Sequence, residues 1–110
     1  MNDELVGKIF EMISAAGTAR AKYIEAIRSA KEEKFDLAKE LIEEGGKCFL
    51  IAHNVHTDML SSEAEDIATS GVNASVSLIL VHAEDQMMNA ESFRIIAEEF
   101  VEVYKKMSGK

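Results

Sequence analysis

The sequence contains no proline and no tryptophan, and only six of its 110 residues are glycine. A β-sandwich of this length without proline would be unusual, whereas long helices must exclude proline from their interiors. The single cysteine, Cys48, cannot form a disulfide within the chain. The length fits one domain over residues 1–110 and leaves no room for a TIM barrel or for a dinucleotide-binding domain with a partner domain.

Basic residues are also scarce: 12 Lys and Arg stand against 20 Asp and Glu, which gives a net charge of −8. This balance argues against a protein that binds nucleic acid or an anionic membrane surface, since both activities depend on clustered Lys and Arg. No apolar run comes near the roughly 20 residues of a membrane span. The start of the chain lacks the basic, apolar and small-residue order of a signal peptide. We therefore expect a cytoplasmic protein.

Apolar residues make up 47% of the chain and recur at helical spacing. The first predicted helix begins near Asp3 and ends at a short charged connection, residues 31–34. The second begins at Phe35, with Asp36 as its N-cap, and keeps its periodicity to Met59.

The periodicity is lost over residues 61–73, which carry a Ser-Ser pair, three acids and a glycine and are predicted to form a loop. A third helix is expected over residues 74–107. The predicted fold class is therefore all-α, with a three-helix bundle as the subunit. The stripes expected to face its core are Leu5, Ile9, Met12, Ala16, Ala19, Tyr23, Ala26 and Ala30; Leu37, Leu41, Gly45, Cys48, Ala52, Val55 and Met59; and Val76, Leu80, Ala83, Met87, Ala90, Ala97, Val101 and Tyr104.

The predicted third helix is apolar on nearly every side, because it carries two further apolar stripes. A helix in a monomeric bundle needs one buried stripe, so the extra stripes predict an oligomer with this helix near its centre. The alternative is a monomer with an unusually apolar surface. The extra stripes are Ile79, Phe93, Ile96, Phe100 and Val103, and Leu78, Val81, Met88 and Ile95.

Polar residues interrupt these stripes in one place. His82, Gln86 and Asn89 share one helix face, and Asp85 stands between Val81 and Met88 on the neighbouring stripe. His82 is either a hydrogen-bonded core histidine or a nucleophile, since neutral imidazole is nucleophilic near pH 7. If the helix lies on a rotation axis, copies of Asp85 meet and require either a cation or a shared proton.

The second predicted helix carries Cys48, His53 and His56. With His82 they allow a zinc-site interpretation, but no recognised zinc motif supports it. A pair of glycines, Gly45-Gly46, lies inside the same helix and is explained by close approach of a neighbouring helix.

The sequence resembles the lactose/cellobiose-type enzyme IIA of the bacterial phosphoenolpyruvate-dependent sugar phosphotransferase system. The resemblance covers nearly the whole chain. It is carried by Ala16-Gly17-Thr18-Ala19-Arg20, Phe35-Asp36-Leu37-Ala38, Ala52-His53 followed by Thr57, and above all Ser77-Leu78-Ile79-Leu80-Val81-His82-Ala83-Glu84-Asp85-Gln86-Met87-Met88.

This resemblance implies a trimer of three-helix subunits, nine helices in all. It implies that His82 accepts phosphate from the histidine-containing phosphocarrier protein and passes it to a cysteine of enzyme IIB, for uptake of a lactose/cellobiose-type disaccharide. It also implies that three copies of Asp85 hold a divalent cation, with magnesium expected, on the trimer axis.

The sequence departs from the family around the expected phosphorylation site. The family usually has glutamine at the position of His56 and histidine at that of Gln86, so a hydrogen bond between these two side chains could survive the exchange. Both are candidates for stabilising the phosphoryl group on His82. Glu84, where the family often has glutamine, adds a negative charge beside His82. An alternative function is therefore a non-catalytic regulatory or interaction protein on the same helical scaffold.

Overall fold

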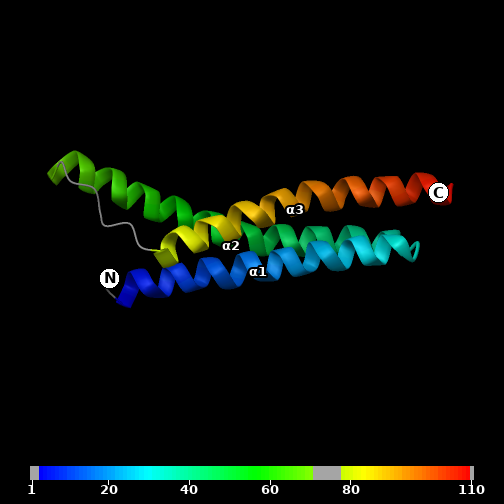
Figure 1. Cartoon of the computed structure of the whole chain (residues 1–110), viewed down its shortest axis with the longest axis horizontal. Helices are drawn as coiled ribbons and strands as arrows, with labels where there is room; N and C mark the ends of the chain where they lie inside the picture. Colours follow the sequence, from blue (N-terminus) through cyan, green and yellow to red (C-terminus); the bar gives the residue numbers. More distant parts are fainter. Residues whose placement is uncertain (1–2, 71–77, 110) are drawn as a thin grey trace.

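The computed structural model describes residues 3–70 and 78–109, and within these ranges it contains helices and no strand. The three helices are α1 (Asp3–Lys31), α2 (Phe35–Ser70) and α3 (Leu78–Ser108). They run alternately up and down in an elongated bundle measuring 60 × 22 × 19 Å (Figure 1). The predicted all-α class and the three-helix subunit are confirmed. Within the described ranges, no helix has the length and apolarity needed to cross a membrane.

A tight turn joins α1 to α2. The Lys34 N–H donates to the Ser29 carbonyl at 2.9 Å, and Glu33, whose φ is +62°, lies in the left-handed conformation that ends many helices. The Ala38 N–H donates to the Lys34 carbonyl at 3.0 Å, so Lys34 is the residue that begins the α2 hydrogen-bond ladder. The prediction that Asp36 is the N-cap was wrong, because Asp36 already lies in the first turn of α2.

α2 is longer than its apolar periodicity predicted. Residues 61–70, predicted as loop, are helical, and the helix ends at Ser70, directly before Gly71. The acids and serines of this segment include no helix breaker, and the Thr69 hydroxyl donates to the Glu65 carbonyl one turn earlier. Residues 71–77, which include the rest of the predicted loop and the first predicted turn of α3, lie outside the described residues.

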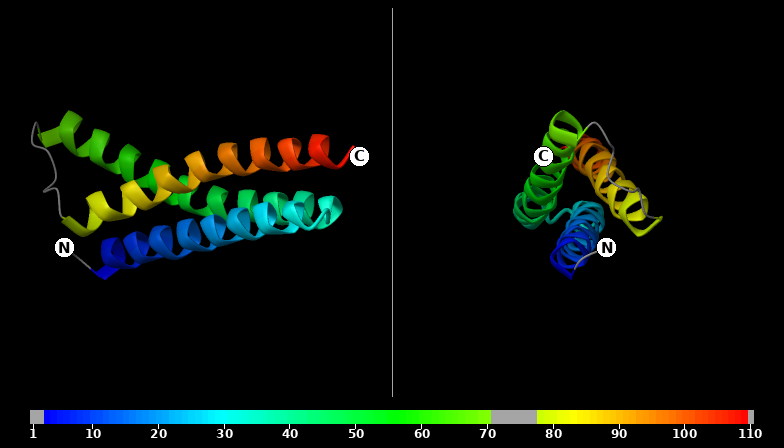
Figure 2. Two further views of the ribbon diagram at one scale, coloured as in Figure 1. Left: turned by 45° about the vertical axis from the view of Figure 1, so that its right-hand side comes forward. Right: turned by 90° about the vertical axis from the view of Figure 1, so that its left-hand side faces the viewer.

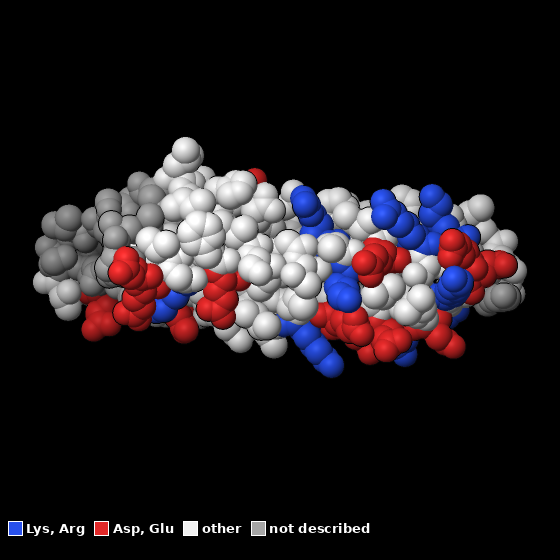
Figure 3. All heavy atoms as spheres, turned by 90° about the horizontal axis from the view of Figure 1, so that it is seen from below, with Lys and Arg blue, Asp and Glu red and all other residues white. Residues whose placement is uncertain are grey.

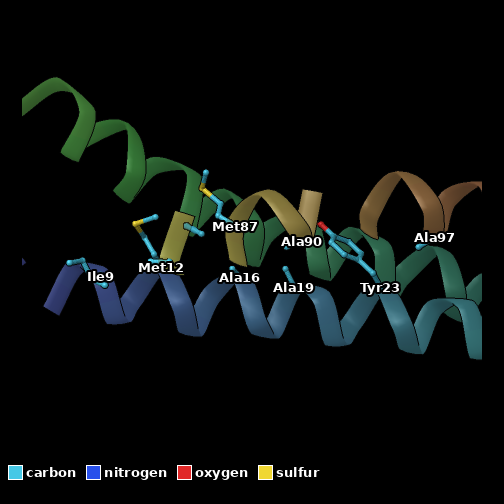
Figure 4. Packing of buried hydrophobic residues seen from close by; sticks show 10 residues of the cluster. Ile9, Met12, Ala16, Ala19, Tyr23, Met87, Ala90 and Ala97 are labelled. Carbon is cyan, nitrogen blue, oxygen red and sulfur yellow. The ribbon is translucent and has the colours of Figure 1, made fainter. Parts of the chain in front are cut away.

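The core lies along the stripes that face the bundle axis (Figure 4). Seven of the eight residues predicted for α1 are buried, and Leu5 is half-buried. On α2 the stripe is displaced at its start, since Leu37 is exposed and Ala38 takes its place. The buried hydrophobic side chains are Ile9, Met12, Ala16, Ala19, Tyr23, Ala26, Ala30, Ala38, Leu41, Ala52, Ala83, Met87, Ala90 and Ala97.

Tyr23 and Gly45 mark the closest approach of α1 and α2. A Cβ atom on Gly45 would lie 2.5 Å from Tyr23 Cε1, so the tyrosine ring occupies the space that a side chain would need. Gly46 has no atom within 4 Å of the corresponding position. Close helix approach therefore explains Gly45 but not Gly46. The Tyr23 hydroxyl, buried in this contact, has no hydrogen-bond partner within the described part of the chain.

The two ends of the bundle differ in how the helices pack. At the packed end, defined here by residues 23–45 and 94–108, all three helices run side by side (Figure 1). At the splayed end, defined by residues 3–12, 53–70 and 78–88, α2 turns away from α3 while α1 stays beside it, as both views in Figure 2 show. Among the described α2 side chains beyond Ala52, none is fully buried.

The α3 stripes that predicted an oligomer are exposed in the single subunit, except for Ile79 and Phe93, which are partly buried against the core. Exposed apolar stripes of this kind are unusual on a monomer and typical of an interaction surface. The side on which α1 lies, seen from below in Figure 3, is by contrast charged: Lys and Arg gather toward the packed end, and Asp and Glu occur at both ends. The exposed large apolar side chains of α3 are Leu78, Val81, Met88, Ile95, Ile96, Phe100, Val103 and Met107.

Candidate functional site

His82 lies in the second turn of α3, at the splayed end, with its side chain exposed. The next residue, Ala83, is fully buried, and Met87 is buried one turn later, so α3 is fixed to the rest of the bundle on the side away from His82. His82 is therefore not a core histidine of the subunit. A rigid helix presents its imidazole to solvent, where another protein can reach it.

Asp85 lies one turn from His82 and is also exposed. Its neighbours on the same side of α3, Val81 and Met88, are 48% and 57% exposed. A carboxylate is thus placed within the uncovered apolar surface rather than on the charged part of the molecule. Gln86, one turn after His82, is half-buried, and Asn89 is exposed. These four polar residues remain on accessible or partly accessible positions of one helix segment.

His56 connects α2 to this segment of α3, and its partner is Glu84. The His56 Nε2 atom lies 3.1 Å from Glu84 Oε2, with the two side chains 16% and 41% exposed. No hydrogen bond joins His56 to Gln86 in the part of the chain that the structure describes, so the predicted His56–Gln86 pair was wrong for the subunit. Residues that are two positions apart in an α-helix differ by about 200° around the helix axis. Glu84 therefore faces α2, while His82 faces away from it.

Sequence reasoning missed this role of Glu84, although a signal was present. The resemblance implies glutamine at both positions, whereas this chain has an acid at Glu84 and a histidine at His56. These two residue types can form a hydrogen-bonded pair, because an ionised carboxylate accepts from an imidazole N–H. The sequence alone did not identify the partner, because one helical step decides whether Glu84 or Gln86 faces α2.

The remaining histidine of α2 is engaged differently. His53 is exposed, and its ring stacks on Phe49 with centroids 6.1 Å apart and an interplanar angle of 25°. Cys48 is a half-buried free thiol beside the core. Over residues 3–70 and 78–109, no three His, Cys, Asp or Glu side chains come together as metal ligands. A zinc site within the subunit therefore has no support.

Comparison with known proteins gives a consistent result. The family described as "PTS system, Lactose/Cellobiose specific IIA subunit" matches residues 7–105. The chain is similar to the PTS system lactose-specific EIIA component of Staphylococcus epidermidis, with 34% identity over 99 residues and 90% of each chain covered. It is also similar to the lichenan-specific phosphotransferase enzyme IIA component of Bacillus subtilis, with 31% identity over 98% of this chain and 94% of the relative.

The fold is similar to solved structures as well. The crystal structure of the PTS cellobiose-specific enzyme IIA from Bacillus anthracis superimposes with a TM-score of 0.89 at 32% sequence identity. That similarity covers 100% of this chain and 96% of the other. The arrangement of the three helices is therefore shared along nearly the whole length of both chains.

Proposed function

The chain belongs to the lactose/cellobiose-specific IIA subunits of the sugar phosphotransferase system, and from this premise we propose that His82 is its phosphoryl acceptor. Membership of the family makes the protein a phosphotransferase component. The observation that carries the assignment to His82 is its exposed ring on a helix anchored by buried Ala83 and Met87. His53 is exposed too, but it stacks on Phe49, and His56 is hydrogen-bonded to Glu84.

The proposed reaction is a pair of phosphoryl transfers. A ring nitrogen of neutral His82 attacks the phosphorus of a phosphohistidine on the histidine-containing phosphocarrier protein. The new P–N bond forms as the old one breaks, and the donor imidazole leaves with the electron pair and takes up a proton. The second ring nitrogen of His82 releases the matching proton. In the next transfer a cysteine thiolate of enzyme IIB attacks the phosphorus, and a P–S bond forms as the P–N bond to His82 breaks. The His82 ring leaves with the electron pair and takes up a proton, which restores neutral imidazole.

Side chains must stabilise the phosphoryl group on His82. A histidine inside a helix has no free backbone N–H groups beside it, because those groups donate to carbonyls one turn earlier. Gln86 lies one turn beyond His82 and carries an amide that can donate to a phosphoryl oxygen. We therefore retain Gln86 as a phosphoryl-contacting residue and give His56 a supporting role through Glu84.

We further propose that three copies assemble through the uncovered apolar face of α3. This face carries Val81, Met88 and Ile95, each about half-exposed in the subunit, and burial of such side chains is the main driving force for association. Threefold packing there would bring three copies of Asp85 together. Carboxylate oxygens are the ligands that magnesium prefers, and one exposed carboxylate per subunit fits a shared ion. The ion would neutralise charges that otherwise repel one another.

The relay that we propose is cytoplasmic and serves uptake of a lactose/cellobiose-type disaccharide. The relatives named above are described as specific for lactose, lichenan and cellobiose. In this scheme the sugar is contacted by other components and not by this subunit.

Intact-mass spectrometry under alkaline conditions, which preserve phosphohistidine, tests the phosphocarrier role. The protein is incubated with phosphoenolpyruvate, enzyme I and the histidine phosphocarrier, with His82→Ala as the variant and His53→Ala as the matched control. We expect one added phosphoryl group in the wild type and in His53→Ala and none in His82→Ala. If the phosphocarrier is labelled but the folded wild type is not, the regulatory alternative replaces the proposal.

The metal proposal has a separate test that does not use phosphorylation. Thermal unfolding with added magnesium and with a chelator should give a higher midpoint with the ion, since a ligand that binds only the folded assembly stabilises it. Asp85→Asn should lose this difference. An equal magnesium effect in the wild type and in Asp85→Asn would contradict the site.

A further inference from the structure

We propose that His56 is a positioning residue for phosphoryl transfer and acts through Glu84, by holding the Glu84 carboxylate against α2 and away from the phosphoryl group on His82. This inference rests on the proposed function. It adds the pair His56 and Glu84, neither of which reacts with the phosphoryl group. The contact that supports it is the 3.1 Å approach of His56 Nε2 to Glu84 Oε2.

The location of the pair gives it this role. His56 lies on α2 one turn beyond Ala52, the last described α2 residue that is fully buried. This part of α2 belongs to the splayed end, where α2 turns away from α3 (Figure 2). Glu84 lies on α3 directly after Ala83, which is fully buried. The α3 backbone is therefore fixed by the core at this point, and the direction of the Glu84 side chain is set by its hydrogen bond to α2.

The charge of Glu84 makes its direction important. A phosphoryl group approaches His82 as an anion, and a carboxylate two residues away raises the electrostatic energy of that approach. Nε2 of His56 donates its hydrogen to Glu84 Oε2 and so directs the negative charge toward α2. The His56 side chain is only 16% exposed. Its surroundings therefore restrict the rotamers that would separate it from Glu84.

Loss of the donor should free the carboxylate from its contact with α2, so that its charge is no longer held on the side of α3 opposite His82. His56→Ala should therefore slow phosphorylation of His82 by about two- to fivefold, the change expected from one unit charge near a solvent-exposed site. Glu84→Gln removes the charge, and it should be phosphorylated at least as fast as the wild type. The double variant His56→Ala/Glu84→Gln should regain the wild-type rate.

This rescue distinguishes positioning from a general structural effect. If His56 merely held α2 against α3, removing its partner as well would not restore the rate. His53→Ala is the matched control, because it removes an α2 histidine that stacks on Phe49 and has no contact with Glu84. Its rate should equal that of the wild type.

The experiment measures the initial rate of phosphoryl transfer from the labelled histidine phosphocarrier at several ionic strengths, with circular dichroism to confirm that each variant is folded. The defect of His56→Ala should shrink at high salt, because screening weakens the repulsion. A wild-type rate in His56→Ala, or a double variant as slow as the single one, would overturn the inference alone. A wild type that takes no phosphate from a labelled phosphocarrier would count against the proposed function as well.

Discussion

The packed end and the splayed end of the bundle use the same three helices in different ways. At the packed end, Tyr23 fills the space above Gly45, and Ala26, Ala30 and Ala38 are buried together. At the splayed end, α2 leaves α3, and His82 and Asp85 are exposed on the α3 surface. The comparison indicates that three-helix packing at one end goes with buried small side chains, whereas the divergence of α2 at the other end goes with exposed reactive groups on α3.

The largest expected effect concerns the apolar surface of the splayed end. Met88→Glu places a charge next to Asp85 on the α3 face that we propose to be buried in a trimer. Sedimentation should change from the mass of three chains of 12.1 kDa each to the mass of one.

Leu37→Glu is the control for this change, because it introduces the same charge at an exposed apolar residue on the first turn of α2. Its mass should equal that of the wild type. If Met88→Glu has the wild-type mass, the assembly does not use this face.

The next effect tests the packed end. Gly45→Ala places a methyl group where the Tyr23 ring lies, and overpacking of this kind costs about 1–3 kcal/mol of unfolding free energy. Gly46→Ala, one residue further along, meets no atom within 4 Å and should stabilise α2 by about 0.5–1 kcal/mol. Denaturant unfolding at fixed protein concentration measures both. Equal effects at the two positions would mean that the close contact with Tyr23 carries no energetic weight.

A smaller effect is expected from the Tyr23 hydroxyl. Tyr23→Phe removes a buried polar atom that has no partner among the described residues, which should stabilise the fold by about 1 kcal/mol. Burial also raises the pKa of the Tyr23 phenol above its usual value of 10.0. The unfolded chain then loses this proton first, so wild-type stability is complete below pH 10 and falls as the pH rises above it.

Chemical denaturation at neutral pH and above pH 10 tests both parts of this prediction. Tyr23→Phe should lose less stability than the wild type as the pH rises. Tyr104 is present in both proteins, so it does not affect the comparison. A destabilised Tyr23→Phe at neutral pH would show that the hydroxyl has a partner after all.

The smallest effect is at the tip of the packed end. Glu33 has a φ of +62°, which is unfavourable for a residue with a Cβ atom. Glu33→Gly should stabilise the protein by about 0.5–1 kcal/mol, whereas Glu32→Gly, at a neighbouring position without a positive φ, should destabilise it. Thermal unfolding of both variants measures the difference. A loss of stability in Glu33→Gly would contradict the argument from backbone strain.

The α1 core stripe, which runs through both ends of the bundle, was the part that the sequence predicted best. Spacing alone identified the buried α1 stripe from Ile9 to Ala30, because that stripe contacts both other helices. The end of α2 was predicted poorly, because none of the side chains that the structure describes over residues 61–70 is buried, and apolar periodicity detects helices only where they pack. The extra α3 stripes indicated correctly that α3 carries many apolar side chains that a single subunit leaves exposed.

The candidate site was predicted in part. The resemblance identified His82 and Asp85, and the structure leaves both exposed, with their chemical roles still to be tested. The partner of His56 could not be predicted, because Glu84 and Gln86 lie two residues apart and only the angle between α2 and α3 determines which of them faces His56. Tertiary geometry of this kind is not encoded in spacing along one helix.

The small size of the core residues determines which mutations the protein can accept. Nine of the fourteen buried hydrophobic side chains in the described residues are alanine. Truncation to alanine, the usual route to a cavity, is therefore unavailable at most core positions, while any enlargement pushes helices apart. Among random substitutions in the core, those that add side-chain volume should therefore be the main cause of lost stability. Natural variation at these positions is expected to be limited to alanine, glycine and serine.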